Sequence, residues 1–294
     1  MSKILIVGGA GFIGSHVADK LSEQGHKVII YDIKKSLYLK ENQIMVLGDN
    51  HDSEKMRKVL DDGVDYVYNF SSIADIEEAK ENLESMIDVN IKGNLKLMKE
   101  CAEVGIKRYI YSSSIYVFSG YGALYKASKQ SAELFIEAFN ETKKLDYTIA
   151  RCGTVYGERA SNWNGFKKII EGIIFSNKLI YDGSGKEVRS FIHVKDLADH
   201  FVSLLDVKYK NKYVTLTGPD EISGFQFVEL LQEIFEKNII DSKIKYKGES
   251  RPNHYINTPY KFFPRSSKKL IKDSYIELGQ GIIEYANILK DKEA

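Results

Sequence analysis

Tyr125 and Lys129 stand four residues apart, a spacing that places both side chains on one face of a helix. A free tyrosine hydroxyl has a pKa of about 10, and an ammonium group one helical turn away favours its ionised form. The pair could therefore take a proton from an alcohol. Because tyrosine and lysine are common in this chain, the same spacing also fits an exposed helix pair with no chemical role.

Three consecutive serines precede this pair at residues 112–114. Ser114 could donate a hydrogen bond to a substrate oxygen or to Tyr125. Lys129 could also hold a nicotinamide ribose. The arrangement predicts an oxidoreductase in which a substrate alcohol gives its proton to Tyr125 and its hydride to a nicotinamide.

A glycine-rich turn near the amino terminus offers a place for that cofactor. It follows a short apolar run and opens a helical pattern. Glycines permit the tight turn and the close approach of a pyrophosphate, and the helix amino terminus supplies N–H donors. Many glycine turns are only turns, but this setting favours a dinucleotide site made by Gly8, Gly11, Phe12, Ile13 and Gly14.

Acidic residues follow the next two predicted strands. Asp32 lies 18 residues past Gly14, where a carboxylate can bind the adenosine ribose hydroxyls and repel a 2′-phosphate. This favours NAD over NADP, although Lys34 and Lys35 follow closely. Asp49 could reach the adenine, or it could be a turn or helix-cap residue.

Polar residues at the ends of later strands are expected beside the cofactor. Phe70 and Ser71 close the fourth predicted strand, and Ser112 closes the fifth. Asn90 is polar in a largely apolar helical segment, so it is expected to tether backbone across to the active strand, which is compatible with a buried structural role.

The elements that must position these residues alternate through the first half of the chain. Strands are predicted at 3–7, 27–32, 43–47, 65–70, 108–112 and 146–150, and helices at 13–24, 53–60, 85–104 and 124–143. Apolar strands separated by helices predict an α/β fold with a doubly wound, parallel, Rossmann-type sheet, which binds ligands at the carboxyl ends of its strands.

The alternation becomes irregular beyond about residue 158. Helices are predicted at 164–175 and 194–205, strands at 178–181 and 188–192, and further elements at 213–217, 225–235 and 281–289. We expect an NAD-binding domain over 1–157, to which the chain returns around 186–206. We expect residues 158–294 to form mainly a smaller substrate lobe.

Composition narrows the partners. The net charge is +1, with 43% hydrophobic and 28% charged residues, which gives no reason to expect nucleic acid or a membrane surface as partner. Cys101 and Cys152 lack metal-ligand spacing, so we expect no metal and two reduced thiols. No apolar stretch reaches about 18 residues. The expected location is the cytoplasm.

The motifs also resemble those of a known family. They are Gly-Gly-Ala-Gly-Phe-Ile-Gly-Ser-His at 8–16, Tyr-Ser-Ser-Ser at 111–114, the Tyr125 and Lys129 pair, Arg-Cys-Gly-Thr-Val-Tyr-Gly at 151–157 and Ser-Phe-Ile-His-Val-Lys-Asp at 190–196. From residue 3 to about 270 the chain resembles the extended short-chain dehydrogenase/reductases, and among them the NAD-dependent nucleotide-sugar epimerases and dehydratases.

This resemblance implies Ser114, Tyr125 and Lys129 as the catalytic set and a nucleotide-diphosphate sugar as substrate. It implies further substrate-binding residues: Thr154 where the family usually has asparagine, Tyr181 as a stacking partner of the base, and Arg189 and Arg251 as clamps on the pyrophosphate, since guanidinium groups bind phosphate oxygens in pairs. It also implies a homodimer formed through two helices, and a role in making sugars for surface polysaccharides.

The residues after Ser114 bear on the reaction. Dehydratases of the family carry an Asp-Glu pair there, but this chain has Ile115 and Tyr116, so elimination of water is not expected. Oxidation at the sugar 4-position remains, as in a 4-epimerase or 4-dehydrogenase. Only ten residues separate Ser114 from Tyr125, fewer than in most epimerases. This shorter segment borders the sugar and would admit a larger one. The alternatives are a reductase of a 4-keto nucleotide sugar, such as a GDP-heptose or GDP-hexose, and a non-catalytic NAD-binding regulator.

Overall fold

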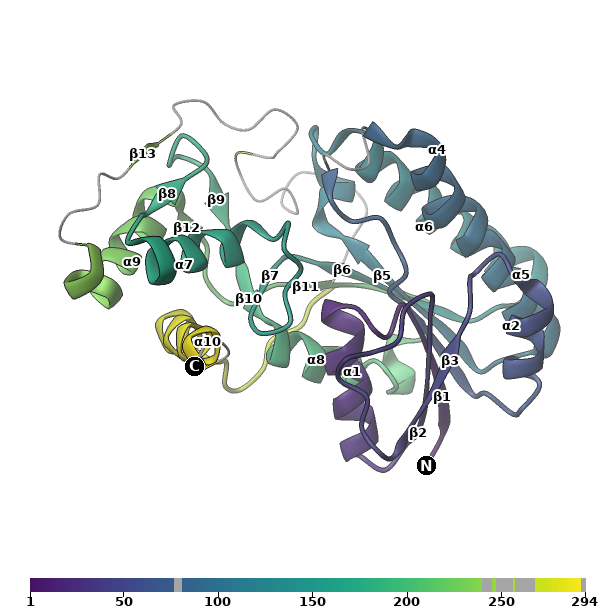
Figure 1. The fold of residues 1–294 in the computed structure, drawn as a ribbon. Coiled ribbons are helices and arrows are strands. Elements are labelled where there is room, and N and C mark those ends of the chain that lie inside the picture. Colours follow the sequence, from purple (N-terminus) through teal and green to yellow (C-terminus); the bar gives the residue numbers. More distant parts are fainter. Residues whose placement is uncertain (77–80, 240–244, 247–255, 257–267, 292–294) are drawn as a thin grey trace.

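The computed structural model describes residues 1–76, 81–239, 245–246, 256 and 268–291 (Figure 1). Its centre is an eight-stranded sheet in the order β14-β11-β6-β5-β4-β1-β2-β3, with every neighbouring pair parallel. The strands are β1 (Lys3–Val7), β2 (Lys27–Asp32), β3 (Gln43–Leu47), β4 (Tyr66–Asn69), β5 (Arg108–Ser114), β6 (Tyr147–Cys152), β11 (Lys212–Leu216) and β14 (Lys268–Lys269). The predicted doubly wound parallel sheet is confirmed.

Both faces of this sheet are apolar and covered by helices (Figure 1). Along β1, Ile4 and Ile6 pack on one face, whereas Leu5 and Val7 pack on the other. The first face is covered by α1 (Phe12–Glu23) and α8 (Val194–Ser203), and the second by α2 (Ser53–Leu60), α5 (Asn94–Val104) and α6 (Ala123–Lys143). Burial on both faces explains why the strands read as nearly continuous apolar runs.

The strand order reverses between β1 and β4, so the chain leaves the sheet in opposite directions from these neighbours. Gly8 follows β1 at this point with a φ of +75°. A Cβ atom on Gly8 would lie 2.6 Å from the backbone nitrogen of Ser71, which follows β4. Only glycine combines this backbone conformation with so close an approach.

The predicted helix at 85–104 is interrupted. It consists of α4 (Leu83–Met86), a π-helical segment η1 (Ile87–Gly93) and α5. Asn90, inside η1, is buried and bonds through its side chain to the backbone of Ile73. A π-helical turn widens the helix locally, and no periodicity of apolar residues signals it.

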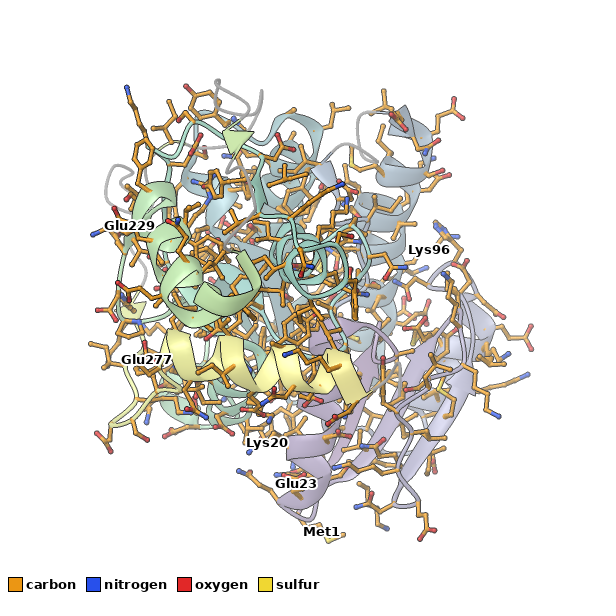
Figure 2. All side chains as sticks on the ribbon, turned by 60° about the vertical axis from the view of Figure 1, so that its left-hand side comes forward. Met1, Lys20, Glu23, Lys96, Glu229 and Glu277 are labelled. Atoms are coloured by element: carbon orange, nitrogen blue, oxygen red, sulfur yellow. The ribbon has the colours of Figure 1, made fainter. Side chains whose placement is uncertain are left out.

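The second half of the chain builds a smaller lobe with its own core. It contains α7 (Gly165–Ser176), α9 (Gly224–Ile239) and α10 (Leu278–Asp291), whose apolar residues form one cluster. In Figure 2, α10 crosses the front of the molecule below α9, with Glu277 at its start. The predicted smaller carboxyl-terminal lobe is therefore confirmed, and the division at residue 157 stays a prediction.

Short strands connect this lobe to the sheet. They are β7 (Thr154–Tyr156), β8 (Ile180–Tyr181), β9 (Val188–Arg189), β10 (Phe191–His193), β12 (Ile222–Ser223) and β13 (Lys245–Tyr246). The single strand predicted at 188–192 is wrong, because β9 pairs with β12 and β10 pairs with β7. Single-turn helices η2 (Ile115–Phe118) and η3 (Val207–Tyr209) follow β5 and α8.

Among the described residues, no helix is long and apolar enough to span a membrane.

Candidate active site

Strand β5 and helix α6 are joined by three hydrogen bonds, each of which involves one of the three consecutive serines 112–114; we call this set the serine ladder. Lys129 donates from Nζ to the backbone oxygen of Ser112 over 2.9 Å. Ser113 donates from Oγ to Glu133 over 2.6 Å. A side-chain hydrogen bond joins Ser114 and Tyr125. The predicted set of Ser114, Tyr125 and Lys129 is thus brought together at the carboxyl end of a central strand.

Burial controls the acidity of the two titratable groups. It lowers the pKa of the Lys129 ammonium to about 8 and raises the pKa of Tyr125 to about 12, although the Ser114 bond acts to lower it. In the chain alone, burial therefore outweighs the effect that we expected from the lysine. A positive nicotinamide beside Tyr125 would supply the charge that favours its phenolate.

A fully buried ion pair between Arg151 and Glu133 adjoins the serine ladder, because Glu133 also accepts from Ser113. Arg151, in β6, donates from Nε and Nη2 to the two carboxylate oxygens of Glu133, over 3.0 and 2.8 Å. The guanidinium lies between the rings of Phe118 and Tyr213, 4.4 and 4.3 Å from their centroids. Two parallel bonds to a carboxylate fix both side chains in one geometry.

The short segment between Ser114 and Tyr125 is well anchored. Gln130 donates from its side chain to the backbone oxygen of Val117 over 2.8 Å. Tyr116 lies edge-on to Tyr125, with ring centroids 6.0 Å apart. Ile115 is buried. Tyr116 therefore brings an aromatic ring to Tyr125, and neither of the two positions after Ser114 carries a carboxyl group.

The glycine turn has the geometry that a pyrophosphate requires. Helix α1 begins at Gly11 without a side-chain cap, so no side chain occupies its first N–H groups. Only the oxygen of Gly8 would lie near a Cβ atom on Gly11, at 3.3 Å, which leaves this side open to a ligand. Gly14 is closed by comparison, since its Cβ atom would lie 2.4 Å from the same oxygen. The residues present fit a dinucleotide, with Phe12 and Ile13 supplying donors.

Asp32 is fixed at the end of β2. Its carboxylate accepts hydrogen bonds from the backbone N–H groups of Ala10 and Lys34, over 3.0 and 3.1 Å. Asp49 is exposed and accepts from the N–H group of His51 over 2.8 Å, as a turn aspartate does. The structure places Asp32 against the glycine turn. Asp49 makes a turn contact, and its contact with adenine stays a prediction.

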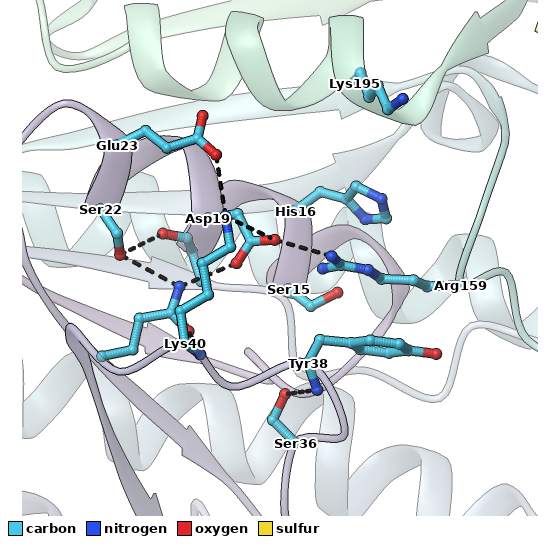
Figure 3. A network of polar contacts seen from close by, with 12 residues as sticks. Ser15, His16, Asp19, Ser22, Glu23, Ser36, Tyr38, Lys40, Arg159 and Lys195 are labelled. Atoms are coloured by element: carbon cyan, nitrogen blue, oxygen red, sulfur yellow. Dashed lines mark hydrogen bonds and ion pairs between the residues drawn. The ribbon is translucent and has the colours of Figure 1, made fainter.

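The loop that follows Asp32 is held against α1 from the other half of the chain (Figure 3). Arg159 ion-pairs with Asp19 of α1 over 2.9 Å. Its guanidinium also lies 4.3 Å from the ring centroid of Tyr38, in this loop. Arg159 thereby connects the segment after β7 to the adenosine side of the predicted cofactor site.

The residues expected after β4 lie beside the glycine turn. Ser71 donates from Oγ to the side-chain oxygen of Asn69 over 2.6 Å and accepts from Asn50 at the same distance. The Phe70 ring packs against Phe201, 4.8 Å away between centroids. Asn90 binds the backbone of residue 73 through both side-chain atoms and donates to Ser128 over 3.0 Å. Asn90 therefore is a tether, but its hydrogen bonds run to the segment after β4 and to α6 rather than to the active strand β5.

The residues expected to bind substrate lie in the smaller lobe and its connections. Thr154 begins β7, and Arg189 ends β9 and donates from Nη1 to the oxygen of Val188 over 3.1 Å. The Tyr181 hydroxyl donates to Glu187 over 3.5 Å. Thr154, Tyr181 and Arg189 are half-buried. Arg251 lies outside the described residues. Among the described residues, no group of three or more His, Cys, Asp or Glu side chains could hold a metal ion.

Comparison with protein families identifies the chain. The model of the NAD dependent epimerase/dehydratase family matches residues 4–214. The chain belongs to this family. The family is NAD-dependent, so the cofactor is NAD, and the sequence-based prediction of both family and cofactor is confirmed.

Individual relatives differ in their reactions. A putative UDP-glucose 4-epimerase of Methanocaldococcus jannaschii is 28% identical, and the match covers 84% of each chain. The dTDP-D-glucose 4,6-dehydratase of Mus musculus is 24% identical over 88% of this chain and 81% of its own. The crystal structure of a UDP-glucose 4-epimerase from Thermotoga maritima with UDP-glucose matches at a TM-score of 0.85 and 24% identity, over 99% of this chain and all of that one. The last likeness shows the shared fold.

Sequence reasoning missed two residues of the site region, Glu133 and Arg151. Glu133 continues the spacing of four from Lys129, and that signal was available in the sequence. Arg151 opens a motif that resembles one of the family. Its bond to Glu133 on α6 could not be predicted without knowing that β6 pairs with β5. The extension of β5 to Ser114 was also missed, because serine is a weak strand former.

Proposed function

We propose that this enzyme catalyses NAD-dependent oxidation and reduction at the sugar 4-position of a nucleotide sugar, as a 4-epimerase or 4-dehydrogenase. The observation that carries the proposal is the serine ladder. It brings Ser114, Tyr125 and Lys129 together at the carboxyl end of β5, on the edge of the sheet where the glycine turn that fits a dinucleotide follows β1.

In the proposed reaction, Tyr125 takes the proton of the 4-hydroxyl group on its own oxygen. Bound NAD supplies the hydride acceptor and donor. Ser114 donates a hydrogen bond to the substrate oxygen and orients the tyrosine. Lys129, held by the backbone oxygen of Ser112, places a positive charge one helical turn from the phenolate.

We propose that the enzyme does not eliminate water. Elimination needs an acid and a base at neighbouring sugar carbons. Ile115 and Tyr116 follow Ser114, and the tyrosine ring lies edge-on to Tyr125. An apolar and an aromatic side chain at these positions support isomerisation or net oxidation over dehydration.

Two other functions remain candidates on the same residues. A reductase of a 4-keto nucleotide sugar, such as a GDP-heptose or GDP-hexose, would use the same groups in the opposite direction. A non-catalytic NAD-binding regulator would keep the fold without turnover. The retention of Tyr125 and Lys129 in one buried hydrogen-bonded set favours an enzyme.

The deciding experiment incubates the purified NAD-loaded protein with a panel of GDP-, UDP- and dTDP-sugars. Chromatographic separation of the sugar nucleotides detects isomerisation, whose product has the mass of the substrate. Mass spectrometry and absorbance of NADH detect dehydration and net oxidation, because only dehydration lowers the product mass by one water. The Tyr125→Phe variant is the matched control. Turnover without mass change and without net NADH supports an epimerase, whereas loss of water would refute the proposal. No turnover, including with 4-keto sugars and NADH, would support the regulator.

Four residues are proposed to bind the substrate: Thr154, Tyr181, Arg189 and Arg251. Arg189 and Arg251 would hold the pyrophosphate, and Tyr181 would stack on the base. Arg189→Ala should raise KM for the sugar nucleotide more than it lowers kcat. An unchanged KM would remove this residue from the proposed site.

We also propose a homodimer, formed through α5 and α6. A groove between these helices is lined by Leu95, Lys96, Lys99, Ala102, Glu103, Phe139 and Lys143. Leu134 and Phe135 on α6 are exposed, at 50% and 38%. Sedimentation of the wild type and of Phe135→Glu tests this, since a charge at such an interface should yield monomers.

We further propose a cytoplasmic enzyme, supported by two buried free thiols, and a role in making sugars for surface polysaccharides.

A further inference from the structure

Glu133 is the third member of a series on α6. Tyr125, Lys129 and Glu133 follow one another at intervals of four residues, so they lie along one face of the helix. Glu133 is 0% exposed. Each of these three side chains forms a hydrogen bond with one residue of the consecutive run 112–114 in β5.

The carboxylate of Glu133 joins three elements. Its Oε1 atom accepts from Ser113 of β5 over 2.6 Å and from Arg151 of β6 over 3.0 Å, while Oε2 accepts from Arg151 over 2.8 Å. Arg151 is also 0% exposed. It lies against Phe118, in the segment that leads from Ser114 toward Tyr125.

A buried ion pair is a costly way to join a helix to a sheet. The free energy needed to remove two charges from water is offset only when the pair has good geometry and further hydrogen bonds. Proteins with apolar residues of similar size in place of such a pair are often equally stable. The position of this pair gives it a second consequence, because a buried charge acts strongly on neighbouring ionisable groups.

We propose that Glu133 and Arg151 are positioning residues for the reaction: together they hold Tyr125 and Lys129 in register with β5 and balance the charge that these two groups experience. The inference rests on the proposed function, in which Tyr125 and Lys129 handle the proton. Neither Glu133 nor Arg151 contacts the reacting atoms in this account.

The electrostatic part follows from the groups packed around Lys129. They come from three elements: Tyr111 on β5, 4.9 Å from Nζ to its ring centroid, Cys152 on β6, and Tyr125 and Glu133 on α6. Burial lowers the pKa of Lys129, whereas Cys152 and, after it, the charge of Glu133 raise it. The guanidinium of Arg151 carries the opposite charge and offsets that of Glu133.

The informative variant is Glu133→Gln, which keeps the shape and the capacity to bond with Ser113. It leaves Arg151 charged and unbalanced, so both Lys129 and Tyr125 should lose their protons at lower pH. We expect the whole pH profile of kcat/KM to move to lower pH by about one unit. In Glu133→Gln combined with Arg151→Met, both charges are gone and the profile should return toward that of the wild type.

A second readout needs no sugar nucleotide. Ionisation of Tyr125 is followed as tyrosinate absorbance against pH in the NAD-loaded protein, by subtracting the matching form that carries Tyr125→Phe. The midpoint should fall in Glu133→Gln and recover in the double variant. A failure of the proposed function would remove turnover but would leave this titration readable.

The matched control is Glu137→Gln, one turn further along α6, whose carboxylate accepts from the hydroxyl of Tyr213. It should leave both pH curves in place. If Glu133→Gln only lowers the height of the profile, or if the double variant fails to restore its position, the pair is structural and the inference is wrong. If the single variant does not fold, the double variant still allows the test, because it leaves no unpaired buried charge and places an apolar side chain between two aromatic rings.

Discussion

The carboxylate of Asp32 accepts a hydrogen bond from the backbone N–H group of Ala10 over 3.0 Å. The acidic residue at the end of β2 and the glycine turn after β1 are therefore one structural unit. A side chain that we assigned to the adenosine ribose also holds the turn that faces the pyrophosphate.

Asp32→Ala should reduce the preference for NAD over NADP. The substitution removes the charge that repels a 2′-phosphate and also frees the turn. We expect NAD to bind about tenfold more weakly, while NADP loses less or gains. Calorimetric titration with both cofactors measures the ratio, with Glu41→Ala, an exposed carboxylate on the following loop, as control. An unchanged ratio would remove the basis for assigning the ribose to Asp32.

Tyr125→Phe should lower turnover by about 100-fold or more, because the proton acceptor is lost. NAD binding should stay within about threefold, since the ring and its packing remain. Steady-state rates and cofactor titration measure the two effects. Tyr121→Phe is the control: Tyr121 is 45% exposed in the same segment. Equal effects of the two variants would contradict the proposed chemistry.

Lys129 should make stability depend on pH. Its pKa is about 8 in the folded chain and 10.5 in the unfolded one, so the unfolded chain holds more protons between these values. Raising the pH through this window therefore stabilises the fold. From pH 7.5 to 9.5, the wild type should gain about 1–2 kcal/mol over Lys129→Met in urea unfolding. Lys126→Met, on the same helix, should track the wild type; a parallel course of all three curves would contradict the burial effect.

Asn90→Leu should destabilise the fold by about 2–4 kcal/mol. Asn90 makes three hydrogen bonds, two with the backbone of Ile73 and one with Ser128, and leucine would leave buried polar groups unpaired. Urea unfolding measures the change. Asn140→Leu, which removes a bond to the oxygen of Leu145 from a half-exposed site, should cost less. Similar losses for both variants would argue against the tether.

The sheet and the grouping of Ser114, Tyr125 and Lys129 were predictable because local signals agreed there. Apolar runs marked the buried strands, glycines marked the turn, and a spacing of four marked Tyr125 and Lys129. The π-helical turn at Asn90 was not predictable, since it depends on a bond to backbone elsewhere in the chain. Glu133 and Arg151 required knowledge of which strand lies beside β5. The bond of Asp49 to His51 shows a turn contact, and the predicted contact of Asp49 with adenine stays a prediction.

The order of the strands has a consequence for synthesis on the ribosome. Strand β6 pairs on one side with β5, but its other neighbour, β11, is translated only after α7, the short strands β7 to β10 and α8. A nascent chain that has folded its first six strands therefore presents the fully buried strand β6 as an open edge, which other chains can pair with. Truncated forms that end before Lys212 should consequently aggregate, and a chaperone that covers this edge would aid production of the full-length enzyme.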